Sequence, residues 1–247
     1  MKAIYLKGPD AQDFLPRVTS GLVKGLAVGE GAPGALLTGQ SRMIAQFDLL
    51  RLGELEFLLA APAACSAALK AGLEKLQFAE DFLVEEAGVL SARPSSSGKR
   101  EGKFLVERGP IWPSPVPGFE YFLSEQESFP EDWDFARIGA LFPCPQDWSP
   151  DAPALEAGML FAVDRFKGCY PGQEVVERSL NVGHPARVLV AMEGKVPLTA
   201  GAKVALEEGG EGMVTSTAIR GGICRAFVRV PWAKRESVVA GCKHLRG

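Results

Sequence analysis

The sequence is poor in the residues that build closed metal sites. It has two histidines, and its five cysteines are widely separated, without any Cys-x-x-Cys pair. An odd number of cysteines at such spacing argues against a disulfide framework and against a zinc or iron-sulfur site closed within one chain. We therefore expect no tightly held metal ion.

Long apolar runs and a strong excess of charge are absent as well. The longest uncharged apolar run, residues 57–69, contains Pro62 and is shorter than the roughly 20 residues that a membrane-spanning helix needs. Near the start, Lys2, Lys7 and Asp10 surround only a short apolar run, which is unlike a signal peptide. The net charge of −3 gives no general attraction to nucleic acid. These features predict a cytoplasmic protein without membrane contact.

The composition that remains is that of a globular protein. Hydrophobic residues make up 47% of the chain and charged residues 23%, which suits a protein with two or three modest cores. The apolar patterns in the first third alternate between strand and helix periods. They predict strands over residues 3–6, 35–38, 43–50, 54–60 and 82–85, and helices over residues 11–15 (capped by Asp10) and 62–78. This order favours an α+β layer with helices on one face of a mostly antiparallel sheet.

The rest of the chain divides at changes of composition. Residues 91–103 are rich in Ser, Gly and charge, which predicts a flexible surface connection. Short strands are expected over residues 104–106 and 121–123, on either side of a proline-rich segment. Four short runs near the end, separated by Gly and Pro, predict a small β-barrel built from residues 186–192, 203–206, 212–217 and 225–230. We divide the chain into an N-terminal α+β domain (1–92), a shortened second α+β domain (93–184) and the barrel (185–247).

Residues 167–178 bring a thiol, an amide, carboxylates and cations together in a short segment. They read Lys-Gly-Cys-Tyr-Pro-Gly-Gln-Glu-Val-Val-Glu-Arg. Gly168 and Gly172 interrupt any regular period, so Cys169 and Tyr170 are expected on a tight loop. We call residues 167–172 the signature loop. The thiol on this loop is either a reactive group or a small buried hydrophobe in a structural turn.

A helix is expected to begin at Gln173, directly after the loop. Glu174 and Arg178 lie four residues apart on one face of this helix, where they are either functional or a solvated ion pair. The helix N-terminus and the ammonium group of Lys167 would both stabilise a thiolate. Cys169 is therefore the most plausible reactive cysteine of the chain.

The pattern Lys-Gly-Cys-Tyr-x-Gly-Gln-Glu-x-x-x-Arg in residues 167–178 resembles the signature of the YgfZ family of folate-binding, iron-sulfur-maturation proteins. That family is related to the T-protein (aminomethyltransferase) of the glycine cleavage system. Residues 8–15, 153–160 and 212–216 resemble further segments of these families. The resemblance implies a T-protein-like α+β fold, in which two α+β segments and a small barrel surround a central folate cavity with the signature loop at its edge.

The resemblance also implies which residues bind folate. Residues 131–143 resemble an Arg-Ile-x-x-Gly-x-Pro stretch that follows a tryptophan at the folate site, so Trp133 is expected to stack on the ligand, unless it is plain core. Arg137 and Arg187 are the expected partners of the acidic folate tail, since a guanidinium can hold a carboxylate through two hydrogen bonds. Glu156 is expected either to anchor the cavity or to be a surface residue. The remaining predicted binding residues belong to the signature stretch: Tyr170, Gln173, Glu174 and Arg178.

Three positions depart from the family pattern. Residues 19–21 read Thr-Ser-Gly where the families have Thr-Asn-Asp. Ala45 and Gln46 stand where the T-protein has carboxylates, one of them catalytic, and Gly139 stands where a glutamate grips the pterin ring. Without an ionised carboxylate, the aminomethyl transfer of the T-protein lacks its base or electrostatic partner. We therefore expect no glycine-cleavage activity.

The sequence and the resemblance together predict a protein that binds tetrahydrofolate or another reduced folate. Its expected role is to assist the assembly or repair of iron-sulfur enzymes, including radical enzymes that modify tRNA, with Cys169 and Lys167 as the functional groups. Iron-sulfur assembly or client proteins are the expected partners. One alternative is a tetrahydrofolate-dependent one-carbon (aminomethyl) transferase. A second alternative is a non-catalytic scaffold without folate.

Overall fold

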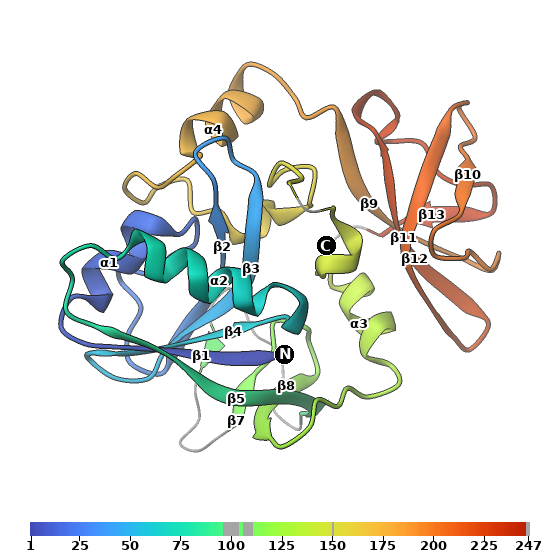
Figure 1. Ribbon diagram of the computed structural model, residues 1–247. Helices are drawn as coiled ribbons and strands as arrows, with labels where there is room; N and C mark the ends of the chain where they lie inside the picture. Colours follow the sequence, from blue (N-terminus) through green and yellow to red (C-terminus); the bar gives the residue numbers. More distant parts are fainter. Residues whose placement is uncertain (96–103, 106–110, 150, 246–247) are drawn as a thin grey trace.

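A computed structural model describes residues 1–95, 104–105, 111–149 and 151–245, and its first part is built on one antiparallel sheet (Figure 1). Eight strands lie in the order β6-β2-β3-β4-β1-β5-β8-β7, and all their pairings are antiparallel. The strands are β1 (Lys2–Lys7), β2 (Glu30–Leu37), β3 (Met43–Arg51), β4 (Glu56–Ala61), β5 (Leu83–Pro94), β6 (Phe104–Leu105), β7 (Ile111–Pro113) and β8 (Phe119–Ser124). The antiparallel sheet expected from the sequence is confirmed.

Both faces of this sheet are buried, because its central strands are apolar at successive positions. On β3, Leu49 belongs to the core on one face, with residues of helices α1 (Ala11–Val18) and α2 (Ala63–Leu76). Leu50 belongs to the core on the other face, which contains Trp133. The alternation of strand side chains thus separates two cores, and both long N-terminal helices cover the same face, as predicted.

A second antiparallel sheet forms the C-terminal part, with the strand order β10-β11-β12-β9-β13. Its strands are β9 (Arg187–Gly194), β10 (Lys203–Ala205), β11 (Glu211–Arg220), β12 (Ile223–Pro231) and β13 (Cys242–His244). Within the described residues, the two edges of this sheet are joined by one isolated bridge, between Leu206 and Val239. The expected small barrel is therefore a half-barrel, and we use that name for residues 187–244.

Short helices connect the two sheets. They are α3 (Trp133–Gly139), η1 (Pro145–Asp147), η2 (Met159–Ala162) and α4 (Gln173–Asn181), and η3 (Trp232–Lys234) follows β12. Figure 1 shows α3 between the large sheet and the half-barrel, and α3 contacts both β11 and β12. Among the helices of the described ranges, none is long and apolar enough to cross a membrane.

Four expectations about the elements need correction. Residues 91–94, expected in a flexible connection, belong to β5, while residues 96–103 lie outside the described part of the chain. The proline-rich segment contains a strand, β7. The boundary predicted between residues 92 and 93 falls inside β5, and a single sheet takes strands from both predicted α+β segments. Asp10 makes no capping bond to α1, because its carboxylate accepts a hydrogen bond from the backbone N–H of Asp81 at 2.7 Å.

Candidate functional site

A cavity of about 660 Å³ lies on the face of the large sheet that α3 covers. Its walls come from β3, the start of α2, β8, α3 and residues 142–146. The volume falls within the range of about 300 to 1,000 Å³ that is typical of small-molecule sites. We call it the Asp48 cavity. A further cavity of about 470 Å³, between α4 and the half-barrel, is lined mainly by apolar side chains such as Leu155, Leu180 and Leu189.

Asp48 is the most unusual group in this cavity. It lies on β3 among apolar neighbours and is only 3% exposed. Among the described residues, neither of its carboxyl oxygens has a hydrogen-bond partner. Burial raises the pKa of Asp48 well above its usual range. A buried polar group without a partner is costly to folding, so a carboxyl left in this state inside a cavity indicates a ligand site.

Trp133 begins α3 and forms an aromatic wall of the same cavity. Its ring packs against Phe129 at 4.9 Å and edge-on against Phe119 at 5.3 Å between ring centroids. It is 7% exposed and belongs to the core as well. Trp133 is therefore both a core residue and a cavity residue, whereas the nearby Phe135 does not line the cavity but packs under the guanidinium of Arg225 from the half-barrel, at 4.0 Å.

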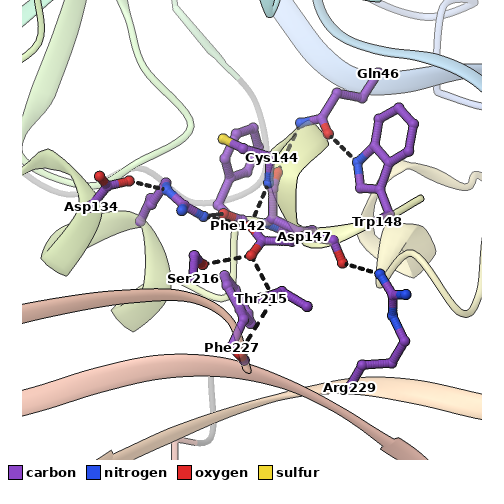
Figure 2. Close-up of polar contacts among 12 residues, drawn as sticks. Gln46, Asp134, Phe142, Cys144, Asp147, Trp148, Thr215, Ser216, Phe227 and Arg229 are labelled. Carbon is purple, nitrogen blue, oxygen red and sulfur yellow. Dashed lines mark hydrogen bonds and ion pairs between the residues drawn. The ribbon is translucent and has the colours of Figure 1, made fainter. Parts of the chain in front are cut away.

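Arg137 lies one helical turn after Trp133 and also borders the cavity. It is fully buried, and its charge is balanced by two carboxylates: Nε donates to Asp134 at 2.5 Å and Nη1 donates to Asp147 at 2.7 Å (Figure 2). Among the described residues, its Nη2 has no hydrogen-bond partner. Because both carboxylates already neutralise this guanidinium, it has little net charge left for an acidic folate tail. Its predicted role as a tail partner stays a prediction.

Gln46, one of the positions that depart from the family pattern, has a structural role in this cavity. Gln46 lines the cavity, where its amide donates to the carbonyl of Pro143 and accepts from the indole of Trp148, both at 2.9 Å (Figure 2). Asp48 lies two residues further along β3 and therefore on the same face as Gln46. Ala45 and Gln46 carry no carboxyl group, but Asp48 of the same strand brings one to this cavity. The available signal was a lone Asp within the apolar run of residues 47–50.

Gly139 faces the half-barrel and does not line the Asp48 cavity. A Cβ atom built on it would collide with the guanidinium of Arg225. That guanidinium is held by Glu193 at 2.8 Å and by the carbonyl of Phe135 at 3.0 Å. A side chain at position 139 would therefore have to displace the guanidinium of Arg225 from these two hydrogen bonds.

The signature loop lies apart from the Asp48 cavity, against the turn between β2 and β3. Gly172 has a left-handed backbone (φ 84°), and a Cβ atom there would lie 2.6 Å from the carbonyl oxygen of Thr38. Only glycine permits this close approach. No residue from 167 to 178 lines the Asp48 cavity, so the expectation that the loop lies at the edge of a folate cavity does not hold for this cavity. α4 follows the loop from Gln173, as predicted.

Cys169 is exposed on this loop, whereas Cys65 and Cys224 are buried and Cys144 and Cys242 are half-buried. The thiol borders a cavity of about 510 Å³ between the loop and residues 16–24. Burial raises the pKa of the Cys144 thiol to about 12. These positions agree with the expectation that Cys169 is the accessible thiol.

Lys167 contacts the N-terminal part of the chain and the neighbouring Tyr170 ring. Its ammonium group donates to the carbonyl of Thr19 and lies 5.1 Å from the centre of the Tyr170 ring. Burial lowers the pKa of Lys167 to about 8 and raises the pKa of Tyr170, which is also buried, to about 12. The lysine thus holds the loop against the N-terminal part of the chain.

The other predicted binding residues are dispersed. Glu156 accepts a hydrogen bond from the backbone N–H of Ala186 at 3.1 Å, next to the half-barrel. Glu174, Arg178 and Arg187 are exposed, and Gln173 is half-buried at the start of α4. In this part of the described chain, the ion pair of α4 is formed by Arg165 and Glu177 rather than by Glu174 and Arg178. The structure therefore brings Trp133 and Arg137 together and leaves the rest outside the Asp48 cavity.

Comparisons with known proteins support the fold. No protein-family model matches the chain, and no curated protein sequence does. Among solved structures, the chain resembles the crystal structure of glycine cleavage system aminomethyltransferase T from Bartonella henselae. The two share 24% sequence identity with a TM-score of 0.76, over 94% of this chain and 76% of that one. The chain therefore has a T-protein-like fold.

Proposed function

We propose that this protein binds a reduced folate in the Asp48 cavity and assists the assembly or repair of iron-sulfur enzymes, including radical enzymes that modify tRNA. The folate part of the proposal depends above all on one observation: an unpartnered, buried carboxyl and an indole ring line the same cavity. The T-protein-like fold supports it, since the similar solved structure is an aminomethyltransferase of the glycine cleavage system.

The chemistry of the cavity suits a pterin ring. The 2-amino-4-oxo edge of a reduced pterin presents adjacent N–H groups, and an ionised carboxylate can accept from both of them, one at each oxygen, so Asp48 would bind the ring in its ionised form although burial raises its pKa in the ligand-free protein. Asp48 would supply this pairing, and Trp133 would supply the face on which the ring packs. The other charged groups that border the cavity are already paired with one another, Arg137 with Asp134 and the Met1 ammonium group with Glu127. An acidic folate tail would therefore extend out of the cavity, and a role for the exposed Arg187 in holding it is a prediction.

The test is a titration of the purified protein with 5-formyltetrahydrofolate, followed by tryptophan fluorescence and calorimetry. We expect the ligand to quench Trp133, so the change should disappear in Trp133→Phe and persist in Trp232→Phe, which alters an indole outside the Asp48 cavity. Absence of both fluorescence change and heat at millimolar folate would remove the folate proposal and favour the scaffold without folate.

The iron-sulfur part of the proposal rests on the resemblance of residues 167–178 and on the exposure of the loop. Cys169 is accessible to a partner, and the neighbouring Phe166 has a fully exposed ring. A single accessible thiolate suits a ligand site shared between two proteins better than a closed cage. Complementation of a strain lacking the gene should fail for Cys169→Ser and succeed for Cys242→Ser. Equal complementation by both variants would show that the function does not require the Cys169 thiol.

The carboxyl at Asp48 also favours a second candidate, a tetrahydrofolate-dependent one-carbon transferase. A buried carboxyl with a raised pKa can serve as a general acid near neutral pH. The same raised pKa makes Asp48 a poor ionised base, and we therefore expect no glycine cleavage. Folate-dependent ammonia release from the aminomethylated carrier protein, above the uncatalysed rate and lost in Asp48→Asn, would establish the transferase instead.

A further inference from the structure

Asp147, at the end of η1, connects the half-barrel to the wall of the Asp48 cavity. It is fully buried, and its two carboxyl oxygens face different parts of the molecule (Figure 2). Oδ2 accepts from Arg137 Nη1 at 2.7 Å and from the backbone N–H of Cys144 at 2.9 Å. Oδ1 accepts from the hydroxyls of Thr215 at 2.7 Å and Ser216 at 2.5 Å. One carboxylate thus joins two cavity residues to two half-barrel residues.

A β-bulge makes the half-barrel side of this contact possible. The register of β11 on β12 pairs Val214 with Val228 and then Ser216 with Phe227, so Thr215 is an extra residue. In a regular strand, adjacent side chains point to opposite faces of the sheet. The bulge turns the hydroxyls of Thr215 and Ser216 toward the same oxygen of Asp147, which is a recognised use of bulges near functional sites. These residues belong to the segment 212–216, for which the sequence predicted no role.

The cavity side of the contact involves residues that border the proposed ligand. Arg137, Cys144 and Gln146 all line the Asp48 cavity, and they flank or contact Asp147. Arg229 of β12 adds a hydrogen bond to the carbonyl oxygen of Asp147 at 2.8 Å. Thr215 and Ser216 do not line the cavity, so any effect they have on a ligand must pass through Asp147.

We infer that Asp147 is a positioning residue that couples the docking of the half-barrel to the shape of the Asp48 cavity and to ligand binding there. The ligand part rests on the proposed folate function. Because a coupling free energy is reciprocal, a ligand that favours the ordered cavity wall must also favour the docked half-barrel. Loss of the two hydroxyls leaves Oδ1 of a buried carboxylate without partners, so α3, which carries Arg137, and the segment that carries Cys144 loosen.

The test uses the double variant Thr215→Val/Ser216→Ala, with Thr217→Val as the control on the same strand. The first measurement needs no ligand: the alkylation rate of Cys144, followed by mass spectrometry of its peptide. We expect faster labelling of Cys144 in the double variant and the wild-type rate in Thr217→Val. Equal Cys144 labelling in the wild type and in a folded double variant overturns the inference.

The second measurement is the affinity for 5-formyltetrahydrofolate, with hydrogen exchange of the half-barrel amides. We expect an affinity about tenfold weaker in the double variant, in line with typical coupling, and slower exchange in β11 on ligand binding in the wild type only. An affinity equal to that of the wild type, without ligand-induced protection of β11, also overturns the inference. If the wild type binds no folate, the proposed function fails, while the labelling of Cys144 still decides whether the half-barrel positions the cavity wall.

Discussion

Replacing Asp48 by asparagine should make the protein more stable at neutral pH, by an amount that grows with pH. In the folded protein burial raises the pKa of Asp48 well above its ordinary value of 3.8, whereas in the unfolded chain the group titrates near that value. Between these two pKa values the folded state binds more protons than the unfolded state. The free energy of unfolding of the wild type therefore falls as pH rises through this window. Asp48→Asn should not show this decrease, because its amide does not titrate.

The size of the effect follows from linkage. One titrating group changes the free energy of unfolding by about 1.4 kcal/mol per pH unit within its window. The advantage of Asp48→Asn over the wild type should thus grow by at most about 2.7 kcal/mol between pH 5 and pH 7. Below the pKa that Asp48 has in the unfolded chain, the carboxyl is protonated in both states. The difference in the free energy of unfolding between the two proteins should then reflect only the exchange of a neutral acid for an amide.

The assay is urea unfolding of the ligand-free protein at several pH values, with Asp151→Asn as the control. Asp151 is exposed and has a left-handed backbone (φ 67°), which asparagine also tolerates. The control should follow the pH dependence of the wild type. If Asp48→Asn also runs parallel to the wild type between pH 5 and pH 7, Asp48 is not an uncompensated buried carboxyl, and the reasoning about the cavity fails.

Three further predictions concern the other site residues. Trp133→Ala should weaken folate binding by about 1 to 3 kcal/mol, by analogy with the stacking of bases on aromatic rings, whereas Trp232→Ala should leave the calorimetric affinity unchanged. Cys169 should be the first cysteine alkylated below neutral pH, as read from labelled peptides, and earlier labelling of Cys65 would contradict this. Burial lowers the pKa of Lys167 to about 8, so its acylation should rise with a midpoint near that pH and not near 10.5, the ordinary value for a lysine.

Much of the fold could be predicted from periodicity alone. The strand expected over residues 43–50 is β3 (Met43–Arg51), and the helix expected over residues 62–78 contains α2 (Ala63–Leu76). These elements have strong apolar periods and clear proline or glycine boundaries. Strand β7 was missed because prolines surround a segment whose pairing with β8 depends on distant residues.

The site was predicted in part. Trp133 was predicted through the resemblance, but Asp48 was not, because the carboxylates of the T-protein correspond to residues 45 and 46. The period of two in β3 already places Gln46 and Asp48 on one face, so the signal was present. The link from Arg137 through Asp147 to Thr215 could not be predicted. Its bond between Asp147 and Thr215 joins residues 68 positions apart and requires a β-bulge that leaves no mark in the sequence.

The central claim, that the Asp48 cavity binds a reduced folate, is tested most directly by calorimetric titration of 5-formyltetrahydrofolate into the wild type, Asp48→Leu and Asp151→Asn. The account predicts a saturable single site in the wild type and in Asp151→Asn. It predicts at least tenfold weaker binding to Asp48→Leu, because the apolar side chain removes the hydrogen bonds to the pterin edge. Absence of binding to the wild type at millimolar folate, or equal affinity in all three proteins, would contradict it.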